Sequence, residues 1–230
     1  MCGRFVSASP PEEIAEYFGA TAIGDELGPN YNVAPTSDVY VVYNNGDQRR
    51  LDPFHWGLVP SFAKDLRIGN KMINARAETV AEKPAFRDAF ARRRCLIIAD
   101  GFYEWERRGP KARHPFHITR TDAAPFAFAG LWATWHGPGD QRLRTCSIIT
   151  TAANDTVREL HDRMPVILDE AAEAAWLDPA TPTALLPELL HSLEPQATAL
   201  REVSRAVNDA RHDEPDCLDP PPPEAEPTLF

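Results

Sequence analysis

Apolar and polar residues alternate along much of the chain, as they do in β-strands that bury one face. From Val39 to Gly57 the alternation continues on both sides of Asn45-Gly46, a dipeptide typical of tight hairpin turns. Apolar or alternating stretches predict further strands at 95–100, 102–107, 115–120, 126–135, 146–153 and 164–168. The pattern therefore predicts a protein in which strands dominate.

Helical patterns are fewer and shorter. Residues 9–20 read as a helix with Ser9 as N-cap, prolines in its first turn and Gly19 at its end. Helices are also predicted at 82–94, at 169–177 and, interrupted by Pro187, at 183–193. Because the strands follow one another without a regular βαβ alternation, we expect an α+β fold with a largely antiparallel sheet.

The chain shows no internal repeat and no Gly/Ser-rich linker, so we expect one domain spanning residues 2–217. Residues 218–230 are Pro-rich and acidic, which predicts a disordered tail. No apolar run is long enough for a membrane span, and the N-terminus lacks the pattern of a secretory signal. These features predict a soluble, intracellular (cytoplasmic) protein without a membrane partner.

Charge is distributed unevenly along the chain. The net charge is −10, yet residues 1–118 hold 16 Lys and Arg against 15 Asp and Glu, whereas residues 119–230 hold 8 against 19. A net negative charge argues against a polyanionic partner only if the charge is spread evenly. The near-neutral first half leaves room for a local basic surface.

The four cysteines are far apart and form no CxxC pair, which argues against a zinc knuckle or a disulfide scaffold. We expect no metal and no cofactor. Cys95 and Cys146 read as buried strand residues. Cys2 differs, because removal of Met1 would give it a free α-amine beside its thiol.

Two chemistries fit an N-terminal cysteine. In one, Cys2 is the nucleophile of an amidohydrolase and its own amine is the general base. In the other, the amine condenses with an aldehyde to a Schiff base, and the thiolate closes a thiazolidine ring. Reference pKa values of about 8 for an α-amine and about 8.5 for a thiol make both nucleophiles accessible near neutral pH.

Either chemistry needs a group that moves protons. Glu104 alternates with aromatic residues on a predicted strand, and His161 lies in the polar cluster HDR before an apolar strand. Taken alone, Glu104 is more simply interpreted as an outward-facing acid on a strand. His161, taken alone, is more simply interpreted as a charge at the end of a helix. The other six histidines are read as structural or surface residues.

Several segments, taken in order, resemble the signature blocks of the SRAP (SOS-response-associated peptidase) family, whose members process abasic sites in single-stranded DNA. No single block is specific, but their shared order covers nearly the whole chain. The blocks are MCGRF, YNVAP, WGLVPSF, MINARAET, ADGFYEW, HDRMPVIL and VSRAVNDAR.

The resemblance implies a single SRAP-type domain with a barrel-like β core flanked by short helices. It also implies a thiazolidine crosslink between Cys2 and the aldehyde of an abasic site. By position, Asn74 matches an orienting asparagine, Glu104 a proton-transfer acid and His161 a Schiff-base histidine. The family pattern places phosphate contacts at Arg4, Arg76 and Arg163, and Phe62 stands where the family commonly has a stacking Trp.

Three functions are compatible with these residues: an abasic-site crosslinker with lyase-like chemistry, a Cys2-dependent peptidase or amidohydrolase, and a non-covalent single-strand binding module. Arginines beside each candidate acid or base, in GRF, NAR and HDR, favour a phosphate-rich substrate over a peptide. The expected partner is single-stranded DNA with an abasic site, at plain strands or at junctions, bound by a monomer.

Overall fold

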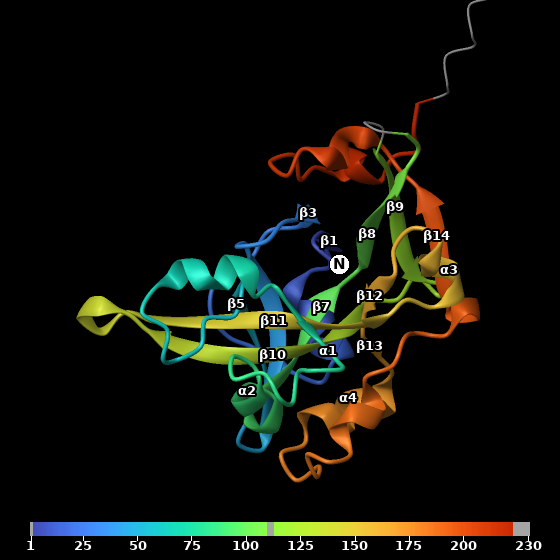
Figure 1. Cartoon of the computed structure of the whole chain (residues 1–230). Helices are drawn as coiled ribbons and strands as arrows, with labels where there is room; N and C mark the ends of the chain where they lie inside the picture. Colours follow the sequence, from blue (N-terminus) through green and yellow to red (C-terminus); the bar gives the residue numbers. More distant parts are fainter. Residues whose placement is uncertain (1, 110–112, 223–230) are drawn as a thin grey trace, which may run out of the picture.

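Five strands close into a barrel at the centre of the molecule (Figure 1). The computed structural model describes residues 2–109 and 113–222. The strands are β4 (Asp38–Asn45), β5 (Gln48–Trp56), β7 (Arg94–Ala99), β10 (Phe126–His136) and β11 (Arg142–Ala152). Neighbouring strands pair antiparallel around the barrel. The barrel closes where β11 runs parallel to β5, with Cys146 opposite Trp56.

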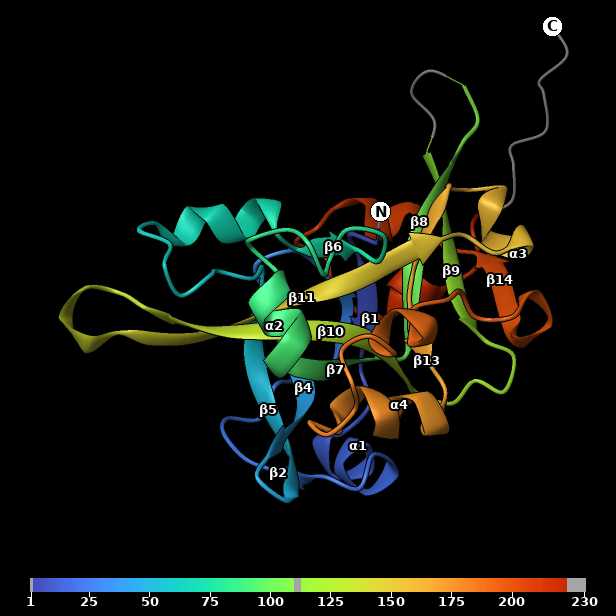
Figure 2. The same cartoon turned by 60° about the horizontal axis from the view of Figure 1, so that its bottom comes forward.

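Short strands extend the barrel at its rim. Three of them pair with the long strands β10 and β11, and the fourth pairs with β5. They are β2 (Thr21–Ala22), β6 (Asn74–Arg76), β12 (Arg163–Pro165) and β13 (Ile167–Leu168). Through β6 and β12, the segments that carry Asn74 and Arg163 lie on either side of β11. Figure 2 shows β6 beside β11.

A second, antiparallel sheet of five strands packs beside the barrel. Phe5, Phe102 and Ile118 on one face join the core cluster that fills the barrel. Val6 and Tyr103 on the other face pack against the C-terminal segment, including Cys217. In order across the sheet the strands are β14 (Thr198–Glu202), β9 (Arg113–Arg120), β8 (Gly101–Arg107), β1 (Phe5–Ser7) and β3 (Asn30–Val33).

The helices are short and cover the outside of the barrel. Ile14, Phe90 and Trp176 anchor three of them in one apolar cluster, and the Trp176 indole donates to the carbonyl of Cys95 at 3.0 Å. The α-helices are α1 (Pro11–Tyr17), α2 (Arg87–Arg92), α3 (Asp155–Arg158) and α4 (Glu170–Leu177). The 3₁₀ segments are η1 (Leu66–Lys71), η2 (Pro138–Asp140), η3 (Leu186–Leu189), η4 (Pro195–Ala197), η5 (Arg205–Asn208) and η6 (Pro215–Leu218).

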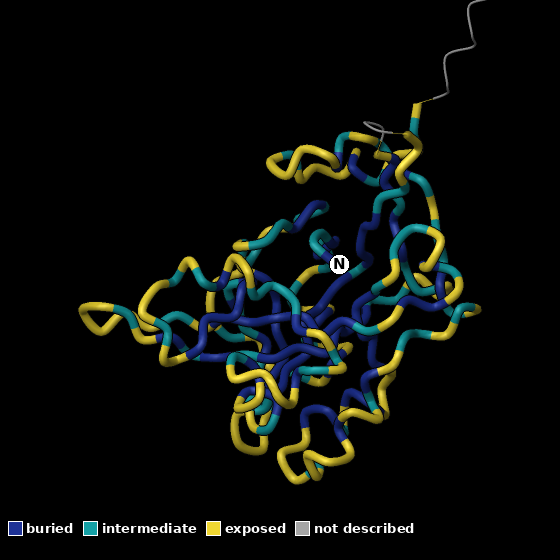
Figure 3. The backbone as a smooth tube through the Cα atoms, in the orientation of Figure 1, coloured by how far each residue is buried: buried dark blue, intermediate teal, exposed yellow. Residues whose placement is uncertain are grey.

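The structure confirms the α+β class, the largely antiparallel pairing and the predicted hairpin. Asn45 pairs with Gln48 across the turn, and Gly46 adopts a φ of +63°, which glycine tolerates without strain. Figure 3 shows buried residues concentrated on the barrel strands and on β8. No helix among the described residues is long and apolar enough to cross a bilayer.

Three details of the predicted helices are wrong. Ser9 does not cap α1: its hydroxyl donates to Asp100 Oδ1 at 2.5 Å, and Pro10 takes the N-cap position. The helix predicted at 82–94 is only α2, because a turn precedes it in which the amides of Phe86 and Arg87 both donate to the Lys83 carbonyl at 2.9 Å. At 183–193 only η3 forms, since Pro187 lacks the amide hydrogen that a longer helix needs.

The first residue of the tail expected at 218–230, Leu218, belongs to the folded part of the chain. Leu218 belongs to η6 and packs against the apolar cluster around Tyr103. Residues 223–230, where most of the expected tail lies, are outside the described residues.

Candidate active site at the N-terminus

The register of β1 places the N-terminal residues beside Glu104. Phe5 pairs with Phe102, and the amide of Tyr103 donates to the carbonyl of Arg4 at 3.0 Å. Continued in the antiparallel direction, this register runs Cys2 and Gly3 along the part of β8 that carries Glu104. The sheet therefore brings together two residues that are about a hundred positions apart in sequence.

Cys2 is fully buried and held from the opposite side by the barrel. Asn74 on β6 donates from Nδ2 to the Cys2 carbonyl at 2.7 Å. The Asn74 Oδ1 atom is buried and has no hydrogen-bond partner among the described residues, so it remains available as an acceptor. Burial, reinforced by the Glu104 carboxylate, raises the pKa of the Cys2 thiol, so the thiol needs a base to become a nucleophile.

Glu104 is a buried acid, contrary to the outward-facing position that is usual for a single glutamate on a strand. Only 5% of it is exposed, and burial raises its pKa to about 7. A carboxyl group with this pKa can accept or donate a proton at neutral pH. Its position beside Cys2 makes it a candidate for exchanging protons with the thiol or with groups bound to it.

His161 lies in the loop between α3 and β12, and the same loop carries Asp162, whose charge acts on Glu104. The Nδ1 atom of His161 accepts from the amide of Arg163 at 2.9 Å and also lies 2.9 Å from an Asp162 carboxylate oxygen. The first contact needs a neutral Nδ1 and the second a protonated one, so they belong to different protonation states. Partial burial lowers the pKa of His161 and favours the neutral ring.

The three predicted phosphate-binding arginines differ in how they are held. Arg4 donates to Asn32 Oδ1 at 2.7 Å and to the Val207 carbonyl at 2.9 Å, with its guanidinium 5.7 Å from the Trp105 ring centre. Arg163 binds Glu78 in a two-point ion pair and also donates to the Thr150 carbonyl.

Arg76 is exposed on β6, two residues after Asn74 and therefore on the same side of that strand. Phe62 is 68% exposed in the loop between β5 and η1, which suits a stacking residue. The structure thus gathers Cys2, Asn74 and Glu104 into one site. It places His161, through Asp162, at the edge of that site.

Asn32 is a residue of this region that sequence reasoning did not single out. It is buried, accepts from Arg4 and directs Nδ2 at the carbonyls of Asp209 at 2.9 Å and His212 at 2.6 Å, with that of Val207 at 3.2 Å. The available signal was its place in YNVAP, where a polar residue lies within a strand. Asn32 ties Arg4 to the C-terminal segment.

Among the described residues, one group of side chains outside this site has the geometry to hold a metal ion. Ligand atoms of His212, Asp216 and Cys217 lie within 4.8 Å of one another. His212 Nε2 is already hydrogen-bonded to Asp216 at 2.6 Å, and Cys217 is buried. This group lies in the C-terminal segment and shares no residue with the Cys2 site.

Comparison with known proteins identifies the family of this chain. The family model described as SOS response associated peptidase (SRAP) matches residues 1–210. The chain belongs to the SRAP family. The structure thus confirms a single-domain SRAP architecture with a closed barrel core.

Relatives with this domain occur in bacteria and animals. The chain is 42% identical over 222 residues to the abasic site processing protein YoqW of Bacillus subtilis, covering 95% of this chain and 99% of the relative. It is 32% identical over 275 residues to the abasic site processing protein HMCES of Mus musculus, covering 96% of this chain and 76% of the relative.

Solved structures agree with this fold. A protein from Bacteroides thetaiotaomicron superposes with a TM-score of 0.88 at 23% identity, covering 95% of this chain and 99% of that one. A phage-related protein from Bordetella bronchiseptica superposes with a TM-score of 0.70 at 33% identity, covering 88% and 94%.

Proposed function

We propose that this SRAP protein captures abasic sites in single-stranded DNA by forming a thiazolidine through Cys2. The observation that carries the proposal is the convergence of a buried thiol, the Asn74 amide and a carboxyl group of pKa about 7 at the N-terminal end of the chain. The names of its relatives, abasic site processing proteins, support the choice of substrate.

The reaction needs Met1 to be removed, so that the Cys2 nitrogen becomes a primary amine. The amine adds to the C1′ aldehyde of the ring-opened sugar, and the carbinolamine loses one water to give a Schiff base. The Cys2 sulfur then adds to the imine carbon while its proton moves to nitrogen, which closes the five-membered ring. One C–N and one C–S bond form, the C=O bond is lost, and no redox partner is needed.

Glu104 is the proposed proton carrier for these steps. As a carboxylate it takes the thiol proton, and as a carboxylic acid it protonates the departing hydroxyl of the carbinolamine. Asn74 fixes the Cys2 backbone through its 2.7 Å bond and offers Oδ1 to a sugar hydroxyl or to the new amine. His161, neutral at pH 7, assists opening of the sugar and reversal of the adduct.

The DNA strand is proposed to follow the arginines around this site. Arg76 is exposed and ready to contact a phosphate, Arg163 adds positive charge near the site, and Arg4 adds it from the side of the C-terminal segment. Phe62 supplies an exposed ring on which a base can stack. All these groups come from one chain, so a monomer is sufficient.

The test uses purified protein and a single-stranded oligonucleotide with one abasic site. The wild-type protein should give a heat-stable, size-shifted conjugate, and Cys2→Ala should give none. Cys2→Ser keeps the amine, so borohydride should trap a Schiff base although no thiazolidine forms. Equal conjugation by Cys2→Ala would overturn the proposal.

A matched control is Cys217→Ala, which removes a buried thiol outside the site. It should conjugate like wild type. Binding of the abasic strand without any conjugate by the wild-type protein would favour a non-covalent module, and cleavage of a peptide substrate that depends on Cys2 would favour the peptidase.

A further inference from the structure

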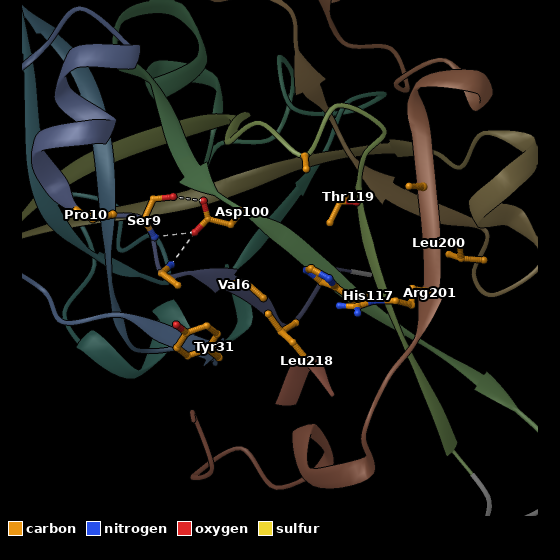
Figure 4. Close-up of a pocket in the computed structure, with 13 residues that line it drawn as sticks. Val6, Ser9, Pro10, Tyr31, Asp100, His117, Thr119, Leu200, Arg201 and Leu218 are labelled. Atoms are coloured by element: carbon orange, nitrogen blue, oxygen red, sulfur yellow. Dashed lines mark hydrogen bonds between the residues drawn. The ribbon is translucent and has the colours of Figure 1, made fainter. Parts of the chain in front are cut away.

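A cavity of about 640 Å³ lies on the outer face of the five-stranded sheet, where Val6 and His117 line it (Figure 4). Cys2 packs in the core cluster on the other face. The cavity lies beside the outer apolar cluster, among β1, β9, β14 and Leu218 of η6, and none of the proposed catalytic residues lines it. Its volume falls within the range of pockets that hold small organic ligands. The cavity is distinct from the Cys2 site, so the proposed reaction of Cys2 with DNA does not explain it.

His117 forms part of the cavity wall and is 93% buried, with a relative exposure of only 7%. No hydrogen bond to either ring nitrogen is found among the described residues. The Nε2 atom is completely enclosed and faces Gly101, so only Nδ1 can meet a ligand in the cavity. A buried polar group without a partner costs free energy, so such groups are usually satisfied by a ligand or water. Burial, with help from Arg201, lowers its pKa to about 4, so the ring is neutral and offers one donor and one acceptor.

Arg201 adds a positive charge to the same wall. It pairs with His117 across β14 and β9, and Figure 4 shows its side chain reaching toward the imidazole. No carboxylate among the described residues lies within ion-pair distance of Arg201. The one acid that lines the cavity, Asp100, is already bound to the amides of Ala8 and Ser9 and to the Ser9 hydroxyl.

The remaining lining is mostly apolar. The Thr119 hydroxyl is the only other side-chain donor on β9 in this wall, and it has no hydrogen-bond partner among the described residues. Facing these polar groups are hydrophobic side chains from other elements: Val6, Pro10, Leu200 and Leu218. The cavity therefore combines an unpaired guanidinium, a neutral imidazole and a hydroxyl with an apolar wall.

We propose that this cavity binds a small organic oxyanion with an apolar body. The oxyanion would meet Arg201, whose planar fork suits a carboxylate or phosphate, and the body would lie against Val6 and Leu218. The Nδ1 atom of His117 and the Thr119 hydroxyl would supply the remaining hydrogen bonds. Such a ligand would pair with Arg201 and with the Thr119 hydroxyl, and it leaves Asp100 in its structural role.

The experiment uses sodium octanoate as the anionic probe and 1-octanol as its neutral counterpart, with the imidazole resonances of His117 followed by NMR. Octanoate should bind saturably, shift the His117 resonances and bind more tightly than octanol. Arg201→Met should weaken octanoate binding about tenfold, the effect of one lost charge-assisted hydrogen bond. Ala199→Phe, which fills the cavity from β14, should abolish it.

Arg107→Met is the matched control, because Arg107 is an exposed arginine on the neighbouring strand β8 and does not line the cavity. Failure of octanoate to shift His117, equal binding of octanol, or no effect of Arg201→Met would each overturn the proposal. All variants should still crosslink abasic DNA like wild type, since Cys2 lies on the other face of the sheet. The two proposals can therefore fail independently.

Discussion

Asn74 Nδ2 donates to the carbonyl of Cys2 at 2.7 Å, which ties Cys2 to strand β6. The bond is made to the backbone of Cys2, so it fixes the residue without occupying its thiol. Without this bond, Cys2 would lose more conformational entropy when it reacts with its substrate. The hydrogen bond from Asn74 fixes the backbone of Cys2 before the substrate binds.

Asn74→Ala should therefore slow crosslink formation about tenfold, the effect of losing one hydrogen bond that orients a reacting group. The rate is measured by single-turnover conjugation to an abasic oligonucleotide. Asn70→Ala, an exposed position in η1, is the control and should react at the wild-type rate. An unchanged rate in Asn74→Ala would remove Asn74 from the site.

Glu104 should make the protein less stable as pH rises toward neutrality. Because its pKa is raised to about 7 in the folded state, folded Glu104 keeps a proton that the unfolded chain releases near pH 4.5. The folded state binds more protons in this window, so the free energy of unfolding falls between about pH 4.5 and 7. The loss is about 3 kcal/mol and levels off above pH 7.

Glu104→Gln should remove most of this pH dependence, because an amide does not titrate. Urea unfolding at pH 5 and pH 7.5 measures this change in the free energy of unfolding. The control is Glu106→Gln, two residues further along β8, which should behave like wild type. The same Glu104→Gln variant should slow crosslinking about a hundredfold, within the range of lost general acid–base catalysis. Equal slopes of stability against pH in Glu104→Gln and wild type would contradict the assigned pKa.

Glu78 should restrain Arg163 from binding DNA. The carboxylate forms a two-point ion pair with the guanidinium, and this contact lowers the pKa of Glu78. Glu78→Gln removes a negative charge beside the proposed phosphate path, so single-strand affinity should rise about threefold at low salt. The gain should shrink as salt increases, because exposed charges are screened.

Fluorescence anisotropy with an intact single strand measures this affinity and avoids the crosslink. Glu82→Gln, an exposed acid four residues further along the chain, is the control. Weaker binding by Glu78→Gln would show that the ion pair holds Arg163 in its binding position instead of competing with DNA.

Asn32→Ala should destabilise the protein by about 2 to 3 kcal/mol, because the carbonyls of Val207, Asp209 and His212 lose a donor at once. Non-covalent DNA binding should also weaken, since Arg4 loses the acceptor that orients it. Asn32→Asp keeps an acceptor for Arg4 but loses the donor to the carbonyls, so it separates the two effects. Thermal unfolding and anisotropy give the two readouts, and equal DNA affinity in all three proteins would exclude a role through Arg4.

Gly101 should resist substitution because of His117. A methyl group at residue 101 would collide with the imidazole Nε2, so Gly101→Ala should cost about 1 to 3 kcal/mol of stability. In a His117→Ala background the same change should cost much less, and this double-mutant cycle measures the coupling. Additive effects would show that the strain comes from elsewhere on the strand.

Local pattern determined much of the secondary structure. Strand alternation and Asn45-Gly46 sufficed for the long hairpin, because period and turn chemistry act over neighbouring residues. The helix ends were less predictable: Ser9 suited an N-cap, but the more distant Asp100 took its hydroxyl. Ordered motifs also located the candidate residues Cys2, Asn74 and Glu104.

The sequence by itself determined which residues carry reactive groups, since a thiol at position 2 and an acid on an aromatic strand can be read directly. Only the tertiary structure decided their chemistry. The pairing of β1 with β8 buries Glu104 and raises its pKa, and β6 brings the Asn74 amide to Cys2. Burial and distance depend on contacts between segments far apart in the chain, and neither is encoded in any one of them.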